Sequence, residues 1–345
     1  MTPSPEQPAG APAGRNGWID GLRALSALSV VLFHFNVLPN MLAPGSLAEA
    51  WREFWLHGYY GVAVFFVLSG YCLIPGWRRS TGLAEFLRRR VLRIMPPYWC
   101  SLLLVALLAL GFKLATGVND IAALPRSPAT VTATLLLLTA PVTTIPALNW
   151  VFWTLSFLLG CYLVVGVVLL LPRSTRMPAL AGLHGLLCLV DMIFHPEPLG
   201  ALFFIRHWPV FGLGVTLAVL PLDRRAGRAM LGTCLLHAAW VASHWPEGLA
   251  FLATGGLAAV LLVLSRNRPF PRWLEPLAGL GRFSYSLYLV HVPVGIYALM
   301  RLCPEKFSSG FQLIITQVML LAATVAAARL YYLMAERPFL PQPRA

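Results

Sequence analysis

Two ionisable residues, Arg23 and His34, lie in one long apolar segment that runs from Trp18 to Phe35. Such residues are costly inside a bilayer, about 2.5–3.5 kcal/mol for an arginine at a helix centre, so a chain that carries them usually uses them. In a helix their spacing brings both side chains to nearly one face, roughly 16 Å apart along the axis. An imidazole can take and return a proton near neutral pH. The segment therefore predicts proton-transfer chemistry at membrane depth.

Asp20 precedes Arg23 by three residues and is expected to pair with it on the same helix face. A structural interpretation of this segment stays equally open. In it, Arg23 reaches to the membrane surface and His34 donates a hydrogen bond to a neighbouring helix.

Four arginines, Arg88, Arg89, Arg90 and Arg93, gather between two apolar segments. One interpretation is a cluster that fixes topology and contacts anionic lipids. The other notes that Arg90 and Arg93 are three residues apart on one helix face. Their guanidinium forks can then converge on the phosphates of a nucleotide-like ligand that enters from the cytoplasm.

The composition identifies the class of protein that must position these residues. Of 345 residues, 58% are hydrophobic and 11% charged, and the mean hydropathy is +0.72. These values indicate an integral membrane protein. The net charge of +13 comes from basic residues between apolar runs, so it favours lipid or phosphate contacts over nucleic acid. Six cysteines are scattered singly, without the close pairs typical of zinc or redox sites.

The apolar pattern predicts an all-α bundle of about ten transmembrane helices with both termini cytoplasmic. A further apolar patch, 129–146, contains Pro141 and Pro146, and the distribution of positive charge favours a model in which it does not span. The predicted spans are 17–38, 57–77, 96–115, 150–171, 178–195, 199–220, 228–244, 247–265, 283–302 and 311–335.

The chain is expected to form one membrane domain over 17–340, with a disordered cytoplasmic tail at 1–16 and a short tail at 341–345. The basic loop from Arg78 to Arg93 predicts a short interfacial helix, with Pro96-Pro97 starting the third span.

Together these features resemble the membrane-bound acyltransferase-3 family over nearly the whole chain. Its opening pattern of a basic residue, ten others and a histidine is met by Arg23 and His34, and its Phe-Phe-x-x-Ser-Gly-aromatic pattern by Phe65 to Tyr71. Further segments follow the family in order and spacing: Arg90-x-x-Arg93 ahead of Pro96, Arg206 with Phe211-Gly-Leu-Gly, Leu280 to Pro293, and Glu336-Arg-Pro-Phe.

The resemblance implies an enzyme that moves an acyl group, with acetyl expected, from acyl-CoA to a hydroxyl of a sugar, a lipid-linked glycan or a secondary metabolite. His34 is then expected to act as general base or acyl relay, and Arg23 and Asp20 are expected to belong to the same catalytic set. The residues expected to bind the donor are Arg90, Arg93, Arg89, Ser69, Gly70 and Tyr71, with Ser69 the expected oxyanion donor. Those expected near the acceptor are Trp153, Tyr162, His291 and Arg206. No metal is expected.

Three positions carry open alternatives. Leu158 stands where the family often has a glutamate, which puts any role of that carboxylate in doubt. His291 either lines the same cavity as His34 or makes a structural hydrogen bond. Glu336 most simply ends the last helix in a local pair with Arg337.

Two rival functions belong to other classes: a proton-coupled transporter, and a degenerate relative that serves as a membrane scaffold. Scarce lysine beside abundant arginine and alanine favours a bacterial source, hence the bacterial cytoplasmic membrane. The expected partners are membrane lipids, acyl-CoA, a hydroxyl-bearing acceptor and a separate extracytoplasmic transferase.

Overall fold

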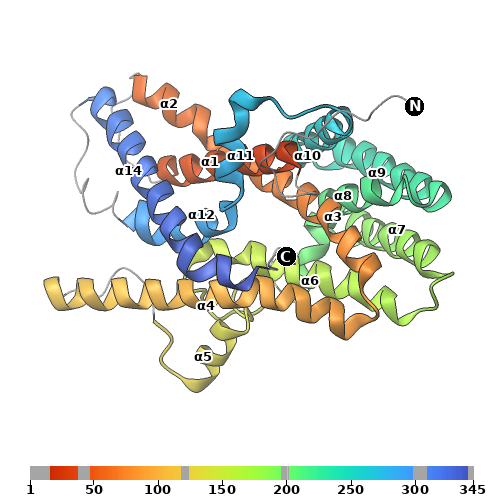
Figure 1. Cartoon of the computed structure of the whole chain (residues 1–345), viewed down its shortest axis with the longest axis horizontal. Helices are drawn as coiled ribbons and strands as arrows, with labels where there is room; N and C mark the ends of the chain where they lie inside the picture. The colour runs from red at the N-terminus through yellow and green to blue at the C-terminus, as the bar shows by residue number, and fades with distance from the viewer. Residues whose placement is uncertain are drawn as a thin grey trace, which may run out of the picture.

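A computed structural model describes residues 16–37, 47–117, 124–195, 200, 202–297 and 309–340. Throughout these ranges the chain forms helices joined by turns, with no strand (Figure 1). The predicted all-α fold is confirmed. The predicted tail at 1–16, apart from Asn16, and the predicted tail at 341–345 lie outside the described residues.

The α-helices are α1 (Gly17–Asn36), α2 (Leu47–Leu56), α3 (Gly61–Arg79), α4 (Leu83–Thr116), α5 (Pro128–Leu135), α6 (Trp153–Val167), α7 (Arg176–Phe194), α8 (Trp208–Val219), α9 (Arg224–His244), α10 (Pro246–Ser265), α11 (Glu275–Gly281), α12 (Ser284–Val290) and α14 (Gly310–Tyr331). Short helical turns join them: η1 (His57–Tyr60), η2 (Trp150–Phe152), η3 (Val168–Leu170), η4 (Phe203–His207), η5 (Arg272–Leu274), η6 (His291–Ile296), η7 (Tyr332–Glu336) and η8 (Arg337–Phe339).

Each predicted span contains a helix, and among the described residues seven helices are long and apolar enough to cross a bilayer. The count of ten and the cytoplasmic termini stay predictions. In the patch 129–146, α5 has eight residues and is followed by turns. Eight residues of helix measure about 12 Å, far less than the roughly 30 Å of a hydrocarbon core. This length agrees with the prediction that the patch does not span.

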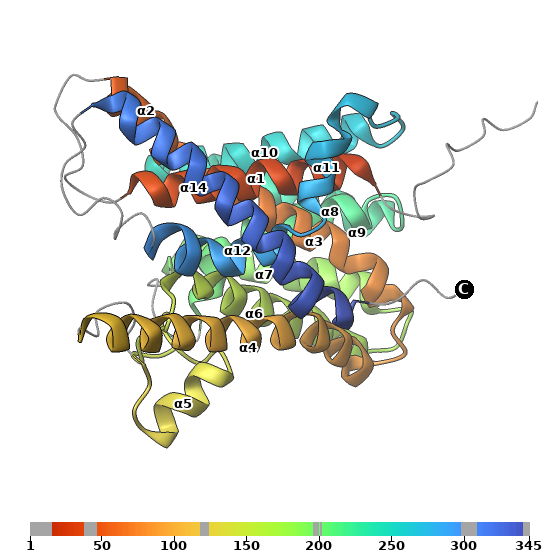
Figure 2. The ribbon, with the colours of Figure 1, turned by 60° about the vertical axis from the view of Figure 1, so that its left-hand side comes forward.

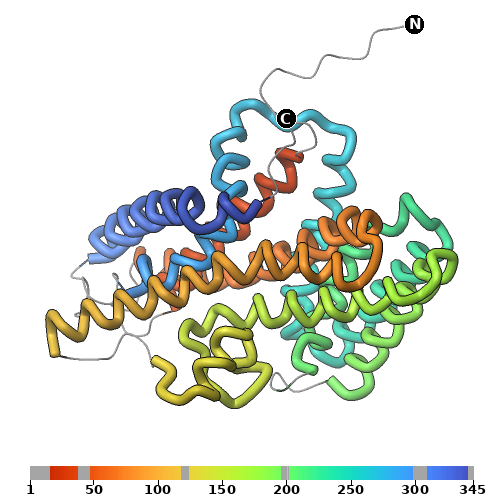
Figure 3. Tube along the Cα trace, turned by 60° about the horizontal axis from the view of Figure 1, so that its bottom comes forward, coloured from red at the N-terminus to blue at the C-terminus, as the bar shows by residue number. Residues whose placement is uncertain are grey.

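Helix α4 corrects the prediction of a separate interfacial helix. Its 34 residues form one rod that continues through Pro96 and Pro97 (Figure 3). The two prolines lack the N–H groups that would bond to the carbonyls of Leu92 and Arg93, and membrane helices tolerate such prolines where neighbouring elements support the helix. The Tyr285 hydroxyl donates to Ile94 O at 2.9 Å, and the Tyr331 hydroxyl donates to Pro97 O. The basic segment is thus rigidly continuous with the membrane helix.

Helices α3 and α8 approach so closely that only glycine fits at two positions. A Cβ at Gly70 would lie 2.1 Å from Phe211 O, and one at Gly214 would lie 2.0 Å from Val67 O. Small residues permit such backbone approach between membrane helices. The contact fixes α3 in the middle of the bundle.

We expect Gly70→Ala to separate α3 from α8 and to destabilise the protein by about 1–3 kcal/mol, the usual effect of overpacking. Thermal unfolding of detergent-solubilised protein measures the change. The matched control is Gly256→Ala in α10, where a Cβ meets no atom within 4 Å. Equal melting temperatures for the two variants would contradict this role of Gly70.

Candidate active site

His34 lies near the end of α1 and faces His291, the first residue of η6. The Nδ1 atom of His34 is 2.9 Å from Val30 O and 3.2 Å from Nε2 of His291. The Nδ1 atom of His291 is in turn 2.7 Å from Tyr288 O. His291 is fully buried, whereas His34 is half-buried. The structure thus brings the two histidines into direct contact, and His291 also bonds to the backbone of Tyr288.

These contacts favour one arrangement of protons. A carbonyl oxygen only accepts, so each Nδ1 carries a hydrogen, and this assignment follows from the network. The Nε2 atom of His291 is then an acceptor for the Nδ1–H of His34. Nε2 of His34 keeps its lone pair, and it bonds to no residue that the structure describes.

Helix α12, which leads directly into His291, is tied to η2 and α6. The Tyr288 hydroxyl accepts a hydrogen bond from Thr154 Oγ1 at 2.9 Å and donates one to Val151 O. The Trp150 ring stacks beside His34, with centroids 6.3 Å apart and an interplanar angle of 24°. Because η2 leads directly into α6, this one segment contacts His34 through Trp150. It also bonds to Tyr288, three residues before His291.

The other end of α1 carries the predicted pair of Asp20 and Arg23. Their closest nitrogen and oxygen are 3.6 Å apart, which confirms the pairing. Asp20 is buried, and Nη2 of Arg23 is also 3.5 Å from the Cys72 sulfur of α3. Arg23 is therefore held between α1 and α3.

Arg90 lies between two aromatic rings at this same end. Its guanidinium carbon is 5.5 Å from the Phe86 ring centroid and 5.7 Å from that of Tyr162. Its Nε atom is buried without a hydrogen-bond partner in the described part of the chain. A Cβ at Gly76 would lie 2.2 Å from Nη2 of Arg90, so the glycine makes room for the guanidinium.

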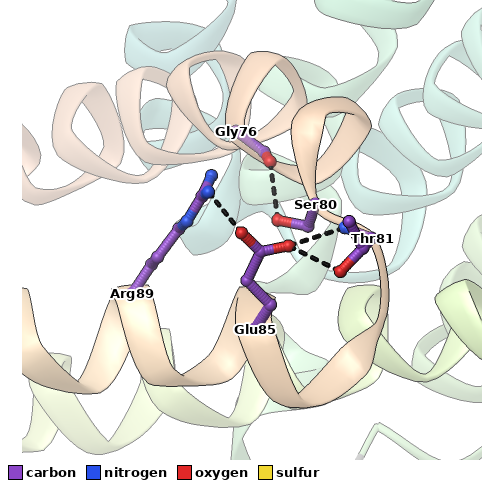
Figure 4. A network of polar contacts seen from close by, with 5 residues as sticks. All are labelled: Gly76, Ser80, Thr81, Glu85 and Arg89. Atoms are coloured by element: carbon purple, nitrogen blue, oxygen red, sulfur yellow. Dashed lines mark hydrogen bonds and ion pairs between the residues drawn. The ribbon is translucent and has the colours of Figure 1, made fainter.

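The charges of Arg23, Arg90 and Arg93 all act on Tyr162. The structure thus brings three of the predicted arginines around one side chain of α6. Arg89 differs, because it forms an ion pair with Glu85 (Figure 4). That carboxylate also accepts hydrogen bonds from Thr81 N at 2.7 Å and Thr81 Oγ1 at 2.8 Å.

Glu336 corrects the expectation of a local pair with Arg337. It is buried and accepts hydrogen bonds from Ser286 Oγ at 2.6 Å and Ser286 N at 3.2 Å. Arg93 and Arg23 also act on this carboxylate through their charges. Glu336 therefore links α12 to the arginine end of the site, and its place in an otherwise apolar last helix was the available signal.

Other predicted residues are not brought together. Trp153 lies 5.3 Å from the His207 ring, whereas Tyr162, nine residues later in α6, lies at the arginine end. Arg206 stacks on Trp245, 4.8 Å from its ring centroid. Ser69 is one turn from Cys72 and so lies nearer to Arg23 than to His34, a position that does not support a role as oxyanion donor. Gly70 serves the α3–α8 contact.

Sequence reasoning missed a buried polar cluster between α7, α8 and α9. His237 Nε2 is 2.8 Å from the Asp191 carboxylate, and His184 Nδ1 accepts from Trp208 Nε1 at 3.2 Å. These helices lie across the bundle from α12 and α14 (Figure 1). Among the described residues, no group of three or more His, Cys, Asp or Glu has a metal-binding arrangement.

Comparisons with known proteins place the chain in a family. The acyltransferase domain that defines the acyltransferase-3 family matches residues 16–333. The exopolysaccharide production protein ExoZ of Rhizobium meliloti is 29% identical over 310 residues, which are 84% of this chain and 91% of that protein. The BcsY protein of Komagataeibacter xylinus is 28% identical over 82% of this chain and 73% of its own length.

A shorter match is the peptidoglycan O-acetyltransferase OatA of Listeria monocytogenes, which is 32% identical over 27% of this chain and 14% of that protein. No solved structure matches the chain. The chain belongs to the acyltransferase-3 family, and it is an integral membrane acyltransferase that transfers groups other than aminoacyl groups.

Proposed function

We propose that this protein transfers an acetyl group from acetyl-CoA to a hydroxyl of a sugar-containing acceptor in a bacterial cytoplasmic membrane. The observation that carries the proposal is the histidine pair, in which Nε2 of His34 is left as a free base. Arg23 lies on the same helix, roughly 16 Å away along its axis. The names of the relatives, one in exopolysaccharide production and one a peptidoglycan O-acetyltransferase, support a sugar hydroxyl as acceptor.

The arginine end of the site suits the diphosphate of CoA. Guanidinium forks bind phosphate oxygens in pairs, and Arg90 has a buried Nε without a partner among the described residues. Arg93 and Arg23 add positive charge at the same place. The pantetheine arm then extends along α1 past Ser69 and Tyr71 of α3 and carries the thioester toward His34.

At the other end, His34 acts as general base. Its Nε2 takes the proton of the acceptor hydroxyl while that oxygen attacks the thioester carbonyl. The new C–O bond forms, the C–S bond breaks, and the imidazolium returns the proton to the leaving sulfur, so the products are an acetyl ester and CoA-SH. His291 stabilises the imidazolium by accepting the hydrogen bond from Nδ1–H of His34.

Aromatic side chains near His34 favour this end of the site as the place where the acceptor binds. Trp150 stacks beside His34 and is 53% exposed, so its other face is open to a ligand. Rings with one packed face and one open edge are suited to amphipathic ligands such as sugars. Trp153 and His291 are the predicted acceptor-side residues that fit this end, whereas Tyr162 fits the donor end and Arg206 stacks on Trp245.

The reaction is tested by incubating detergent-solubilised protein with labelled acetyl-CoA and bacterial extract, then identifying the labelled product by mass spectrometry. We expect release of CoA thiol together with an O-acetylated glycan. Transport of a solute into vesicles without consumption of acetyl-CoA would contradict the proposal.

In this mechanism His291 positions His34 and does not touch the substrate. Substitutions of His291 should therefore lower kcat to different degrees, according to whether the new side chain can accept a hydrogen bond from His34. We expect His291→Leu to lower kcat about ten- to hundred-fold, the range for losing a group that orients a functional imidazole, with little change in KM for acetyl-CoA. His291→Gln should recover part of this rate, because its amide oxygen can accept from His34. Steady-state kinetics of both variants decide the point, and equal rates for Leu and Gln would argue for packing alone.

A further inference from the structure

A pocket of about 330 Å³ lies between α11, the start of α12 and α14. Its apolar floor is built from Pro276, Leu280, Phe283 and Val325, and two arginines, Arg282 and Arg329, line it as well. The pocket is an open hollow at the surface that combines apolar side chains with two guanidiniums. The acyl-transfer mechanism described above uses none of these residues.

The two guanidiniums are arranged to bind an anion. Arg329 lies over the rings of Phe283 and Tyr332, 5.6 and 5.5 Å from their centroids. A guanidinium that stacks by its face keeps its N–H edges free for hydrogen bonds. Arg282 pairs with the exposed carboxylate of Glu275 at 3.5 Å. Two positive charges against one negative charge leave the pocket net positive.

The pocket adjoins the proposed diphosphate site. Gly281, next to Arg282, packs on the start of α1, where an added Cβ would lie 1.8 Å from Asp20 O. Three residues beyond Phe283, Ser286 binds Glu336, which feels the charges of Arg93 and Arg23. In Figure 2 the start of α1, α11, the start of α4 and the end of α14 lie toward the same side of the molecule.

CoA carries two separate anionic groups: the diphosphate, and a 3′-phosphate on the ribose that also bears adenine. Resting on the acetyl-CoA activity proposed above, we propose that this pocket binds the 3′-phosphoadenosine end of the donor. Arg282 and Arg329 hold the 3′-phosphate, and Pro276, Leu280 and Val325 pack against the adenine. A lipid phosphate offers the same charge but has no base for this apolar lining.

The test compares CoA with 3′-dephospho-CoA by calorimetric titration of the full-length protein in nanodiscs of neutral lipid. We expect the wild type to bind CoA about ten- to hundred-fold more tightly, since hydrogen bonds between charged groups contribute strongly. The double variant Arg282→Gln/Arg329→Gln should bind CoA only as well as dephospho-CoA, with dephospho-CoA affinity unchanged. Arg225→Gln, at an exposed arginine of α9, is the matched control. It should retain the full difference in affinity between CoA and 3′-dephospho-CoA.

Any other result contradicts either the acetyl-CoA function or the 3′-phosphate site. A wild type that binds neither nucleotide contradicts the acetyl-CoA function itself. Equal wild-type affinity for both nucleotides, or an undiminished difference in the double variant, contradicts the 3′-phosphate site. If the double variant keeps that difference but retains less phosphatidylglycerol than the wild type after extraction from mixed-lipid nanodiscs, the pocket is a lipid site and the inference is wrong.

Discussion

His34→Ala is expected to lower kcat for acetyl transfer by about 10²–10⁴-fold, the usual contribution of a general base. The affinity for acetyl-CoA should stay within about twofold, because the phosphates are proposed to bind at the far end of α1, roughly 16 Å away. The reason is chemical: without Nε2 of His34, no group takes the hydroxyl proton as the oxygen attacks. Initial rates of thiol release at saturating acetyl-CoA, with equilibrium binding of the same preparation, measure both quantities.

His57 provides a matched control for this substitution. Its Nδ1 lies 3.0 Å from the carbonyl of Glu53, four residues earlier, as His34 Nδ1 lies 2.9 Å from Val30 O. His57 is exposed and makes no contact with His291 among the described hydrogen bonds. His57→Ala should therefore turn over like the wild type. A large loss of kcat in both variants would indicate that removing a histidine near a helix end disturbs the structure, whatever its contact with His291.

Arg90→Gln is expected to weaken acetyl-CoA binding about ten- to hundred-fold while changing kcat at saturation little. Arg93→Gln should act in the same direction. Both side chains are proposed to contact phosphates, which are equally distant from the reacting atoms in the ground and transition states. Calorimetric titration with acetyl-CoA and steady-state KM test the effect.

Arg89→Gln is the control, since Arg89 is already paired with Glu85 at the turn between α3 and α4. We expect its acetyl-CoA affinity to remain within about twofold of the wild type. An equal loss in Arg89, Arg90 and Arg93 variants would favour a diffuse attraction to positive charge. A loss confined to kcat in the Arg90 variant would contradict a phosphate-binding role.

The local pattern of the sequence predicted the helices and one ion pair. Apolar runs of about 20 residues mark membrane helices because the bilayer fixes their length, and the i, i+3 spacing of Asp20 and Arg23 fixes their pairing. Proline misled the prediction at Pro96-Pro97, since α4 continues through both residues and tyrosine hydroxyls on other elements bond to carbonyls beside them. Such contacts between distant segments are absent from any local pattern.

Contacts between distant segments were harder to predict. His34 and His291 are 257 residues apart, and Ser286 and Glu336 are 50 apart. Which faces of two helices meet depends on their rotation and tilt, which similar apolar side chains do not specify. The buried pair of Asp191 and His237 was missed for the same reason. The resemblance to a family left open whether His291 shares a cavity with His34, and it did not give their direct contact.

We propose above that His34 performs the proton transfer that moves acetyl from CoA to the acceptor. This role is tested by a single-turnover reaction of nanodisc-embedded protein with labelled acetyl-CoA and the acceptor found by mass spectrometry. We expect the label to pass to an O-acetyl ester in the wild type but to stay on bound thioester in His34→Ala. Transfer at the wild-type rate in that variant would contradict it.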